Sequence, residues 1–238
     1  MSSQRDILVV EKISSGYGDM QVLWDVSIKL PECKVVAILG PNSAGKSTLL
    51  KTIAGMLKPY TGKIIYRGDV INSLAPGRIA KKGLVYVPHP PGLTFPSLTV
   101  RENLELSVAG LKLREDDLKK RLERVFELFP SLEKLLARPA ERLSGGERQM
   151  LNIAMGLMRN PQVLMLDEPS SGLAPKLKKE LFETIATINK QGVSILLVEQ
   201  DVAGALSLSN YGYVIKGGRV TLEGDPSYLL GKKEALYF

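Results

Sequence analysis

The stretch at residues 40–47 constrains the fold of this chain more than any other feature of the sequence. It reads Gly-Pro-Asn-Ser-Ala-Gly-Lys-Ser and matches the pattern G-x-x-x-x-G-K-[ST] at every fixed position. A continuous apolar run at residues 35–39, typical of a strand covered on both faces, precedes it, and a helical stretch at about residues 46–57 follows. Because the pattern requires this order of strand, loop and helix, we predict an α/β fold.

The residue types in this loop fit the binding of a triphosphate. Glycine at positions 40 and 45 allows the backbone to curl so that successive N–H groups point inward. The helix that begins near Lys46 adds the positive end of its dipole. We expect Lys46 to reach the β- and γ-phosphates and the Ser47 hydroxyl to bind Mg²⁺. The predicted nucleotide-binding residues of the loop are Gly40, Pro41, Asn42, Ser43, Ala44, Gly45, Lys46, Ser47 and Thr48.

Two acidic residues, Asp167 and Glu168, follow a second buried strand that is expected at residues 163–166. The strand would deliver Asp167 to the edge of the sheet, where its carboxylate can hold Mg²⁺ through Ser47 or a water molecule. Glu168 would be poorly placed as another metal ligand and well placed to polarise an attacking water molecule as a general base. Two solvated acids at the end of a strand are the alternative, which the phosphate-binding loop makes the weaker interpretation.

The remaining patterns divide the chain into strand-rich ends and a helical middle. Strands are expected at residues 8–13, 22–30 and 193–198, and hairpins at 61–70 and 213–222. In the second strand, alternation places one set of apolar side chains on a common face: Val22, Trp24, Val26, Ile28 and Leu30. We predict one domain over residues 1–238, with a core at 1–89 and 156–238, a helical subdomain at about 90–155, and a mainly parallel sheet with helices on both faces.

The composition excludes some kinds of site and indicates a cellular location. The chain has a single cysteine, Cys33, which cannot form an internal disulfide. With only one histidine as well, the chain cannot form a zinc site of cysteines and histidines. No run approaches 18 apolar residues, and the first residues lack the apolar core of a secretory signal, so we expect a cytoplasmic protein. The net charge of +7 fits a nucleic acid, a phosphate ligand or an anionic membrane as partner, or simply a solvated basic surface.

A third motif, Leu-Ser-Gly-Gly-Glu-Arg-Gln at residues 143–149, combines a helix start with two glycines. Ser144 and Glu147 have the spacing of a capping box that opens an apolar helix. Gly145 and Gly146 would leave backbone N–H groups exposed to an anion in the first turn. The motif also fits a well-capped core helix, and both interpretations can hold together, because a phosphate site needs a capped N-terminus.

Together, the three motifs resemble those of the nucleotide-binding subunits of ABC transporters, whose signature reads LSGGQ or LSGGE. The resemblance covers nearly the whole chain. It implies a P-loop NTPase core of the RecA-like type, N-terminal antiparallel strands, an inserted helical subdomain, and ATP with Mg²⁺ as cofactors. It further implies that Ser144, Gly145, Gly146 and Glu147 contact the ATP held in a second subunit, so that two nucleotides are sandwiched in a dimer. Tyr17 stands where the family places an aromatic ring on adenine, although a plain tyrosine at a strand end also fits.

The sequence departs from the family pattern at two positions. His89 stands where a glutamine is expected, and Gln200 stands where a histidine is expected. Gln200 can donate a hydrogen bond toward a γ-phosphate, but it cannot carry charge or shuttle a proton. His89 can contact Mg²⁺ or the attacking water only when it is neutral, and it is equally well explained as a surface histidine among prolines. We expect hydrolysis because Glu168 is present, while Gln200 leaves the rate open.

Four segments, at residues 95–104, 168–170, 172–175 and 197–200, are similar to the second ATPase subunit of branched-chain amino acid importers. This resemblance implies an ATPase that drives uptake of branched-chain amino acids or a similar small polar solute, at the inner face of the cell membrane. Its expected partners are an identical or related ATPase subunit, integral membrane permease subunits and, indirectly, a solute-binding protein. The junction at about residues 88–101 would pass the motion of the dimer to the permease.

Two other functions remain as alternatives. An ABC-type ATPase acting on nucleic acid or ribosomes would suit the basic charge, but the interval between Lys46 and Asp167 holds no long coiled coil and the chain has no long basic arm. We therefore expect no nucleic-acid partner. A regulatory nucleotide binder that hydrolyses slowly would account for Gln200.

Overall fold

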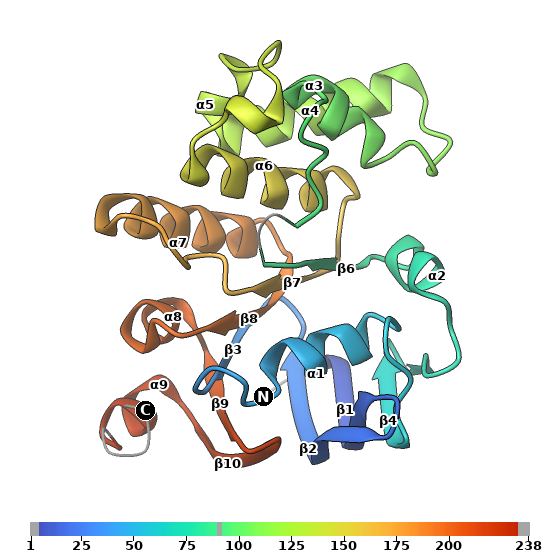
Figure 1. Ribbon diagram of the computed structural model, residues 1–238, viewed down its shortest axis with the longest axis vertical. Helices are drawn as coiled ribbons and strands as arrows, with labels where there is room; N and C mark the ends of the chain where they lie inside the picture. Colours follow the sequence, from blue (N-terminus) through green and yellow to red (C-terminus); the bar gives the residue numbers. More distant parts are fainter. Residues whose placement is uncertain (1–4, 90–91, 233–238) are drawn as a thin grey trace.

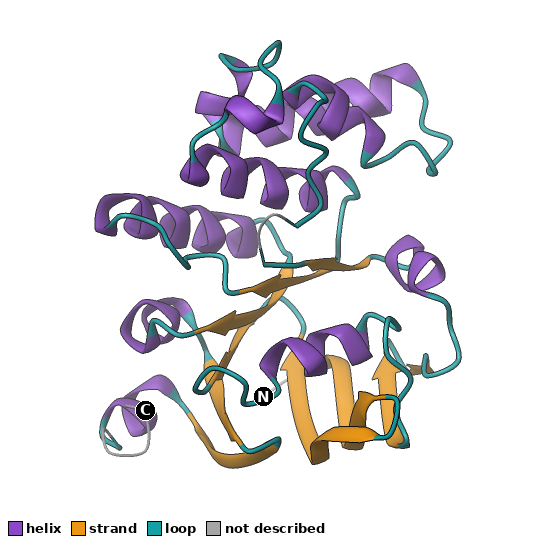
Figure 2. Ribbon diagram, in the orientation of Figure 1, coloured by secondary structure: helices purple, strands orange, loops and turns teal. Residues whose placement is uncertain are grey.

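The computed structural model describes residues 5–89 and 92–232, and two β-sheets organise this part of the chain (Figures 1 and 2). The central sheet has six strands in the order β10-β9-β3-β8-β7-β6. Its strands from β9 to β6 pair in parallel, and β10 pairs antiparallel with β9. This confirms the mainly parallel sheet. The strands are β3 (Val35–Leu39), β6 (Leu84–Val87), β7 (Val163–Asp167), β8 (Ser194–Glu199), β9 (Tyr211–Lys216) and β10 (Arg219–Gly224).

The second sheet is antiparallel and is built from the first part of the chain. Its order is β2-β1-β4-β5, and the last two strands form the hairpin expected at residues 61–70. This sheet confirms the N-terminal antiparallel strands that the family resemblance implied. Its strands are β1 (Asp6–Tyr17), β2 (Met20–Pro31), β4 (Thr61–Tyr66) and β5 (Asp69–Val70).

The predicted common face of β2 is wrong at Trp24, which does not lie on the buried side with Val26, Ile28 and Leu30. Its side chain is 41% exposed, whereas Leu23 is fully buried. The pairing of β1 with β2 shifts register between Ile13 and Ser15, and Asp25 has a φ of 50° at this point. An extra residue in β2 therefore forms a bulge, which reverses the faces of the residues before it.

The two faces of the central sheet are covered differently. Side chains at Val35, Ala37 and Leu39 join the helices, whereas Val36 and Ile38 face α1 and the antiparallel sheet. Helices therefore lie on both faces, as expected, but on the second face α1 and α2 share the covering with the N-terminal sheet. The helices of the core are α1 (Lys46–Ile53), α2 (Pro76–Lys81), α7 (Pro175–Lys190), α8 (Val202–Leu208) and α9 (Pro226–Leu230).

Two of these helices differ in detail from what the sequence suggests. Helix α1 ends at Ile53 rather than near residue 57, because Gly55 takes a φ of 74° directly after its C-cap. In α7, the apolar side chains at helical spacing are buried at Leu181, Phe182, Ile185 and Ile188, and Leu177 is only half-buried. Among the described residues, no helix combines the length and the apolar character needed to cross a membrane.

A group of helices lies between β6 and β7, where the helical subdomain was expected. Figure 1 shows α3, α4 and α5 stacked on α6, which lies between them and the central sheet. Buried residues such as Val125, Phe129 and Leu151 join these helices into the same apolar cluster as α7 and α8. Pro90 and Pro91, which belong to the predicted junction at about residues 88–101, lie outside the described residues. The helices are α3 (Val100–Leu106), α4 (Glu115–Leu128), α5 (Pro130–Glu133), the 3-10 turn η1 (Ala140–Arg142) and α6 (Gly145–Met158).

Candidate functional site

The loop between β3 and α1 is a tight turn that only glycine can form at its two ends. Gly40 and Gly45 have φ values of 155° and 102°. A Cβ atom at position 40 would overlap the carbonyl oxygen of Ile215, and one at position 45 would lie 2.7 Å from Cδ2 of Leu23. The loop therefore keeps its shape because neighbouring strands leave no room for a side chain.

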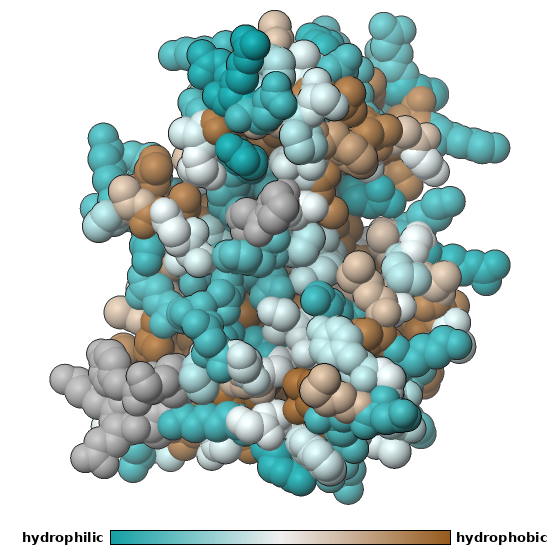
Figure 3. Space-filling model, in the orientation of Figure 1, coloured by the Kyte–Doolittle hydropathy of each residue, from teal (hydrophilic) through white to brown (hydrophobic). Residues whose placement is uncertain are grey.

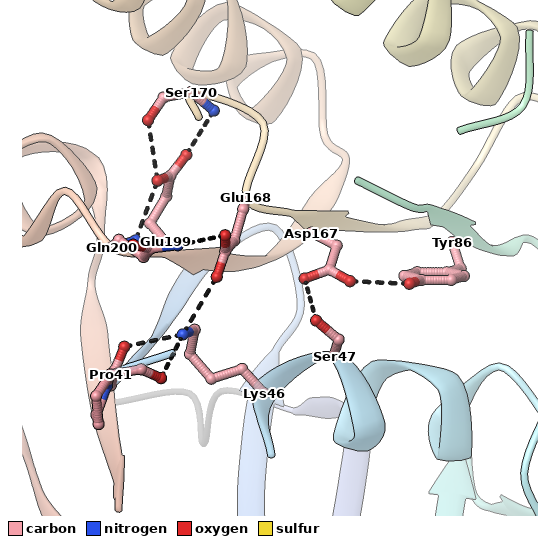
Figure 4. A network of polar contacts seen from close by, with 10 residues as sticks. Pro41, Lys46, Ser47, Tyr86, Asp167, Glu168, Ser170, Glu199 and Gln200 are labelled. Carbon is pink, nitrogen blue, oxygen red and sulfur yellow. Dashed lines mark hydrogen bonds and ion pairs between the residues drawn. The ribbon is translucent and has the colours of Figure 1, made fainter. Parts of the chain in front are cut away.

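Lys46 bends back over this loop. Its side chain is almost fully buried, and Nζ donates hydrogen bonds of 2.8 Å to the carbonyl of Gly40 and 2.9 Å to that of Pro41. Nζ also lies 3.2 Å from Oε1 of Glu168 (Figure 4). A buried ammonium group needs such partners. The anionic oxygens of a phosphate in the loop could take the same role.

The first acidic residue, Asp167, ends β7 and has both carboxylate oxygens engaged (Figure 4). Ser47 Oγ donates to Oδ1 over 3.0 Å, and the Tyr86 hydroxyl donates to Oδ2 over 2.9 Å. Burial raises the pKa of Asp167, while these two hydrogen bonds lower it. Burial and the nearby carboxylate raise the pKa of Tyr86, so this phenol stays a hydrogen-bond donor.

The second acidic residue, Glu168, lies between a cation and an amide. Its Oε1 faces Lys46, and its Oε2 accepts a hydrogen bond of 2.5 Å from Nε2 of Gln200. Glu168 has a φ of 48°, a left-handed conformation that turns the chain sharply after β7. The structure thus brings together three residues that the sequence placed on separate segments. In this arrangement both carboxylate oxygens are occupied by neighbours of Glu168.

A buried carboxylate that the sequence analysis missed, Glu199, joins the segments carrying Glu168 and Gln200. It accepts hydrogen bonds from the backbone N–H and the hydroxyl of Ser170, over 2.8 and 2.9 Å, and from the N–H of Gln200 over 3.2 Å. Burial raises the pKa of Glu199, and these hydrogen bonds lower it. An acidic residue at the end of an apolar strand was the available signal. Tyr86, which is also missed, lies between Val85 and Val87 on the apolar strand β6 and gave no comparable signal.

The loop opens into a cleft of about 530 Å³. Tyr17, at the end of β1, and His89, after β6, line this cleft together with residues 42–48 of the loop and Glu168. Tyr17 is 43% exposed, and Lys51 Nζ lies 5.7 Å from the centre of its ring. His89 is exposed. Tyr17 and His89, two of the predicted site residues, therefore lie beside the loop, although both are far from it in the sequence.

The third motif lies elsewhere on the molecule. Ser144 caps α6, its hydroxyl accepts from the N–H of Glu147 over 3.3 Å, and its own N–H donates to the Glu147 carboxylate over 2.7 Å. This confirms the predicted capping box. Ser144 and Gly145 are exposed, and Gly146 is buried close to Leu177. None of the four residues at 144–147 is among the described residues that line the cleft of the loop.

The residues beside the loop fit a nucleoside triphosphate with Mg²⁺. The glycine-dependent turn and the buried ammonium of Lys46 suit phosphate oxygens. Ser47 and Asp167 offer a hydroxyl and a carboxylate within 3.0 Å of each other, and oxygen atoms are the ligands that Mg²⁺ prefers.

Comparisons with known proteins agree on one family. A family profile described as "ABC transporter" matches residues 23–171. The chain is 39% identical to the high-affinity branched-chain amino acid transport ATP-binding protein BraG of Pseudomonas aeruginosa, over 94% of this chain and 95% of BraG. It is also 39% identical to a probable branched-chain amino acid transport ATP-binding protein, LivF, of Archaeoglobus fulgidus, over 92% of each chain. The solved ADP conformation of MJ1267, an ATP-binding cassette of an ABC transporter, superposes with a TM-score of 0.86 at 27% identity, over 97% of each chain.

Proposed function

This chain belongs to the ABC transporter ATP-binding family, whose members are ATPases coupled to transport, and from that premise we propose that it energises the import of branched-chain amino acids or a similar small polar solute. The substrate class is supported by two relatives, BraG and LivF, which match at 39% identity over more than nine-tenths of the chain. The observation that carries hydrolysis is the meeting of Lys46, Glu168 and Gln200 above the phosphate loop.

The residues around the loop divide the work of hydrolysis. Lys46 and the loop N–H groups hold the phosphates, and Ser47 and Asp167 hold Mg²⁺. When bound, the metal supplies positive charge to the phosphate oxygens. Glu168 orients the attacking water and accepts its proton, for which its carboxylate must leave Lys46. Gln200 donates a hydrogen bond from its neutral amide toward the γ-phosphate.

The tip of α6 serves a nucleotide bound to a second ATPase subunit, either a copy of this chain or a related one. Its support is twofold: Ser144 and Gly145 are exposed at a helix N-terminus, and they lie apart from the cleft of their own chain. An exposed helix start with a polar cap is suited to phosphate oxygens. Tyr17 stacks on the adenine of the nucleotide in its own cleft.

The membrane permease docks beside the helical subdomain. Phe95 and Leu106 are exposed there, at 49% and 42%, and Figure 3 shows apolar side chains gathered over the helical part of this face. Exposed apolar patches of this kind mark sites of protein contact. The permease would hold the chain peripherally at the inner face of the cell membrane, and a solute-binding protein would act through the permease.

Two variants test this function. Glu168→Gln keeps the shape of the side chain but removes the base, so it should trap a dimer in the presence of Mg-ATP, measured by size-exclusion chromatography with light scattering. Lys46→Ala should abolish ATP binding in an equilibrium assay. A Glu168→Gln protein that stays monomeric at saturating Mg-ATP would refute the sandwich mechanism, and unchanged affinity in Lys46→Ala would refute the phosphate loop.

The substrate is tested separately. The chain is co-expressed with a candidate permease and a candidate solute-binding protein from the same genome and reconstituted in vesicles. Uptake of leucine, isoleucine and valine is then compared with uptake of an acidic amino acid. ATP-dependent uptake restricted to the acidic amino acid would reject the proposed substrate class while leaving the ATPase assignment intact.

A slow, regulatory nucleotide binder is the second candidate, and the hydrogen bond from Gln200 to Glu168 favours it. A glutamine that holds the general base could keep turnover low. A large gain in turnover in Gln200→His would support this candidate, and unchanged or lower turnover would count against it.

A further inference from the structure

The turn of the β9–β10 hairpin contacts the phosphate loop, although the two lie far apart in the sequence. The N–H of Gly218 donates a hydrogen bond of 3.0 Å to the carbonyl of Ala44, inside the loop. The carbonyl of Gly218 accepts a hydrogen bond of 2.8 Å from the N–H of Trp24, on β2. One residue of the hairpin therefore links the loop to the strand that flanks it.

The same hairpin also borders the start of the loop. Strand β9 pairs in parallel with β3, with Val214 opposite Leu39, and the next carbonyl along β9, that of Ile215, fills the space beside Gly40. The loop is thus held at its first glycine by the end of β9 and near its last glycine by the turn. These contacts would fix its curvature without any help from a bound ligand.

Gly218 occupies its place for two separable reasons. It has a φ of 74°, which favours glycine, and a Cβ atom there would overlap the carbonyl of Val22 and lie 3.0 Å from Cδ1 of Trp24. Its neighbour Gly217 has a similar φ of 54°, but a Cβ atom there would meet no atom within 4 Å. Gly217 and Gly218 therefore form a matched pair: both have a backbone conformation that favours glycine, but only Gly218 is closely packed.

We propose that Gly218 is a positioning residue for nucleotide binding, which sets the shape of the phosphate loop through the Ala44 carbonyl. This inference rests on the proposed function, because it requires the loop to hold ATP. Asp167 and Glu168, at the end of β7, form their side-chain bonds with residues outside the hairpin: Ser47, Tyr86, Lys46 and Gln200. Displacing the turn would therefore weaken nucleotide binding more than the chemical step.

The test compares Gly218→Ala with Gly217→Ala in the full chain. Steady-state ATP hydrolysis should give a KM raised about tenfold in Gly218→Ala, as expected for the loss of one buried hydrogen bond, with kcat little changed. Gly217→Ala should keep the wild-type KM. Trp24 is the single tryptophan of the chain, so its emission reports the local displacement, which should appear only in Gly218→Ala. A KM that is the same in both variants would overturn the proposal.

A measurement without any substitution at the turn covers the case in which Gly218→Ala does not fold. Hydrogen exchange of a peptide covering residues 212–222 is followed in Glu168→Gln with and without Mg-ATP. Slower exchange of this peptide with nucleotide supports the proposal, and unchanged exchange refutes it. If the protein binds no ATP, the proposed function fails together with this inference, whereas ATP binding with unchanged exchange removes the inference alone.

Discussion

Ser144 is predicted to have two roles that substitution can separate, stabilising α6 and contacting a nucleotide on a second subunit. Its hydroxyl and N–H both bond to Glu147 in the capping box. Replacing it with alanine removes the side-chain acceptor, and loss of an N-cap costs about 1 kcal/mol. For a chain of this size, that corresponds to a fall in Tm of roughly 2–4 °C.

Aspartate caps a helix about as well as serine does, so Ser144→Asp should keep the stability of the wild type. Its negative charge, however, would face the phosphates of the nucleotide on the partner subunit. We therefore expect Ser144→Asp to fold normally and to lose ATP-dependent dimerisation, whereas Ser144→Ala is less stable and dimerises more weakly than the wild type.

Thr99 provides the matched control, because it forms the capping box of α3 with Glu102 and is not part of the motif at residues 143–149. Thr99→Ala should lose stability by a similar amount and leave dimerisation unchanged. Thermal unfolding without nucleotide measures the first effect, and light scattering of the Glu168→Gln background with Mg-ATP measures the second. Ser144→Asp that dimerises as well as the wild type would refute the assignment of the α6 tip to a phosphate.

Two further predictions concern the buried carboxylates. Tyr86→Phe leaves an oxygen of Asp167 without its donor, so the free energy of unfolding measured in urea should fall by about 1–3 kcal/mol; an unchanged value would show that this hydrogen bond does not stabilise the site. The pKa of Glu199 is raised in the folded state, which therefore binds its proton more tightly than the unfolded chain does. Relative to Glu199→Gln, the wild type should gain stability as the pH falls through this raised pKa toward the usual value of 4.5, and a difference between the two proteins that does not vary with pH would contradict this reasoning.

The local structure of each motif could be predicted from the sequence, because each motif consists of neighbouring residues. The strand, loop and helix around Lys46, the acidic end of β7 and the capping box at Ser144 each depend on residues within one short segment. Backbone preferences, capping and apolar periodicity act over that range, so the pattern of residue types was sufficient to predict them.

Tertiary structure alone decided which segments meet. The sequence could not place Tyr86 against Asp167, Glu199 against Ser170 or Gly218 against Ala44, because each contact depends on strand order and on the register between strands. The bulge in β2 shows the same limit, since one extra residue moved Trp24 to the surface against its alternation pattern. Residue types determine what a segment can form, and only packing between distant segments determines which side chains share a site.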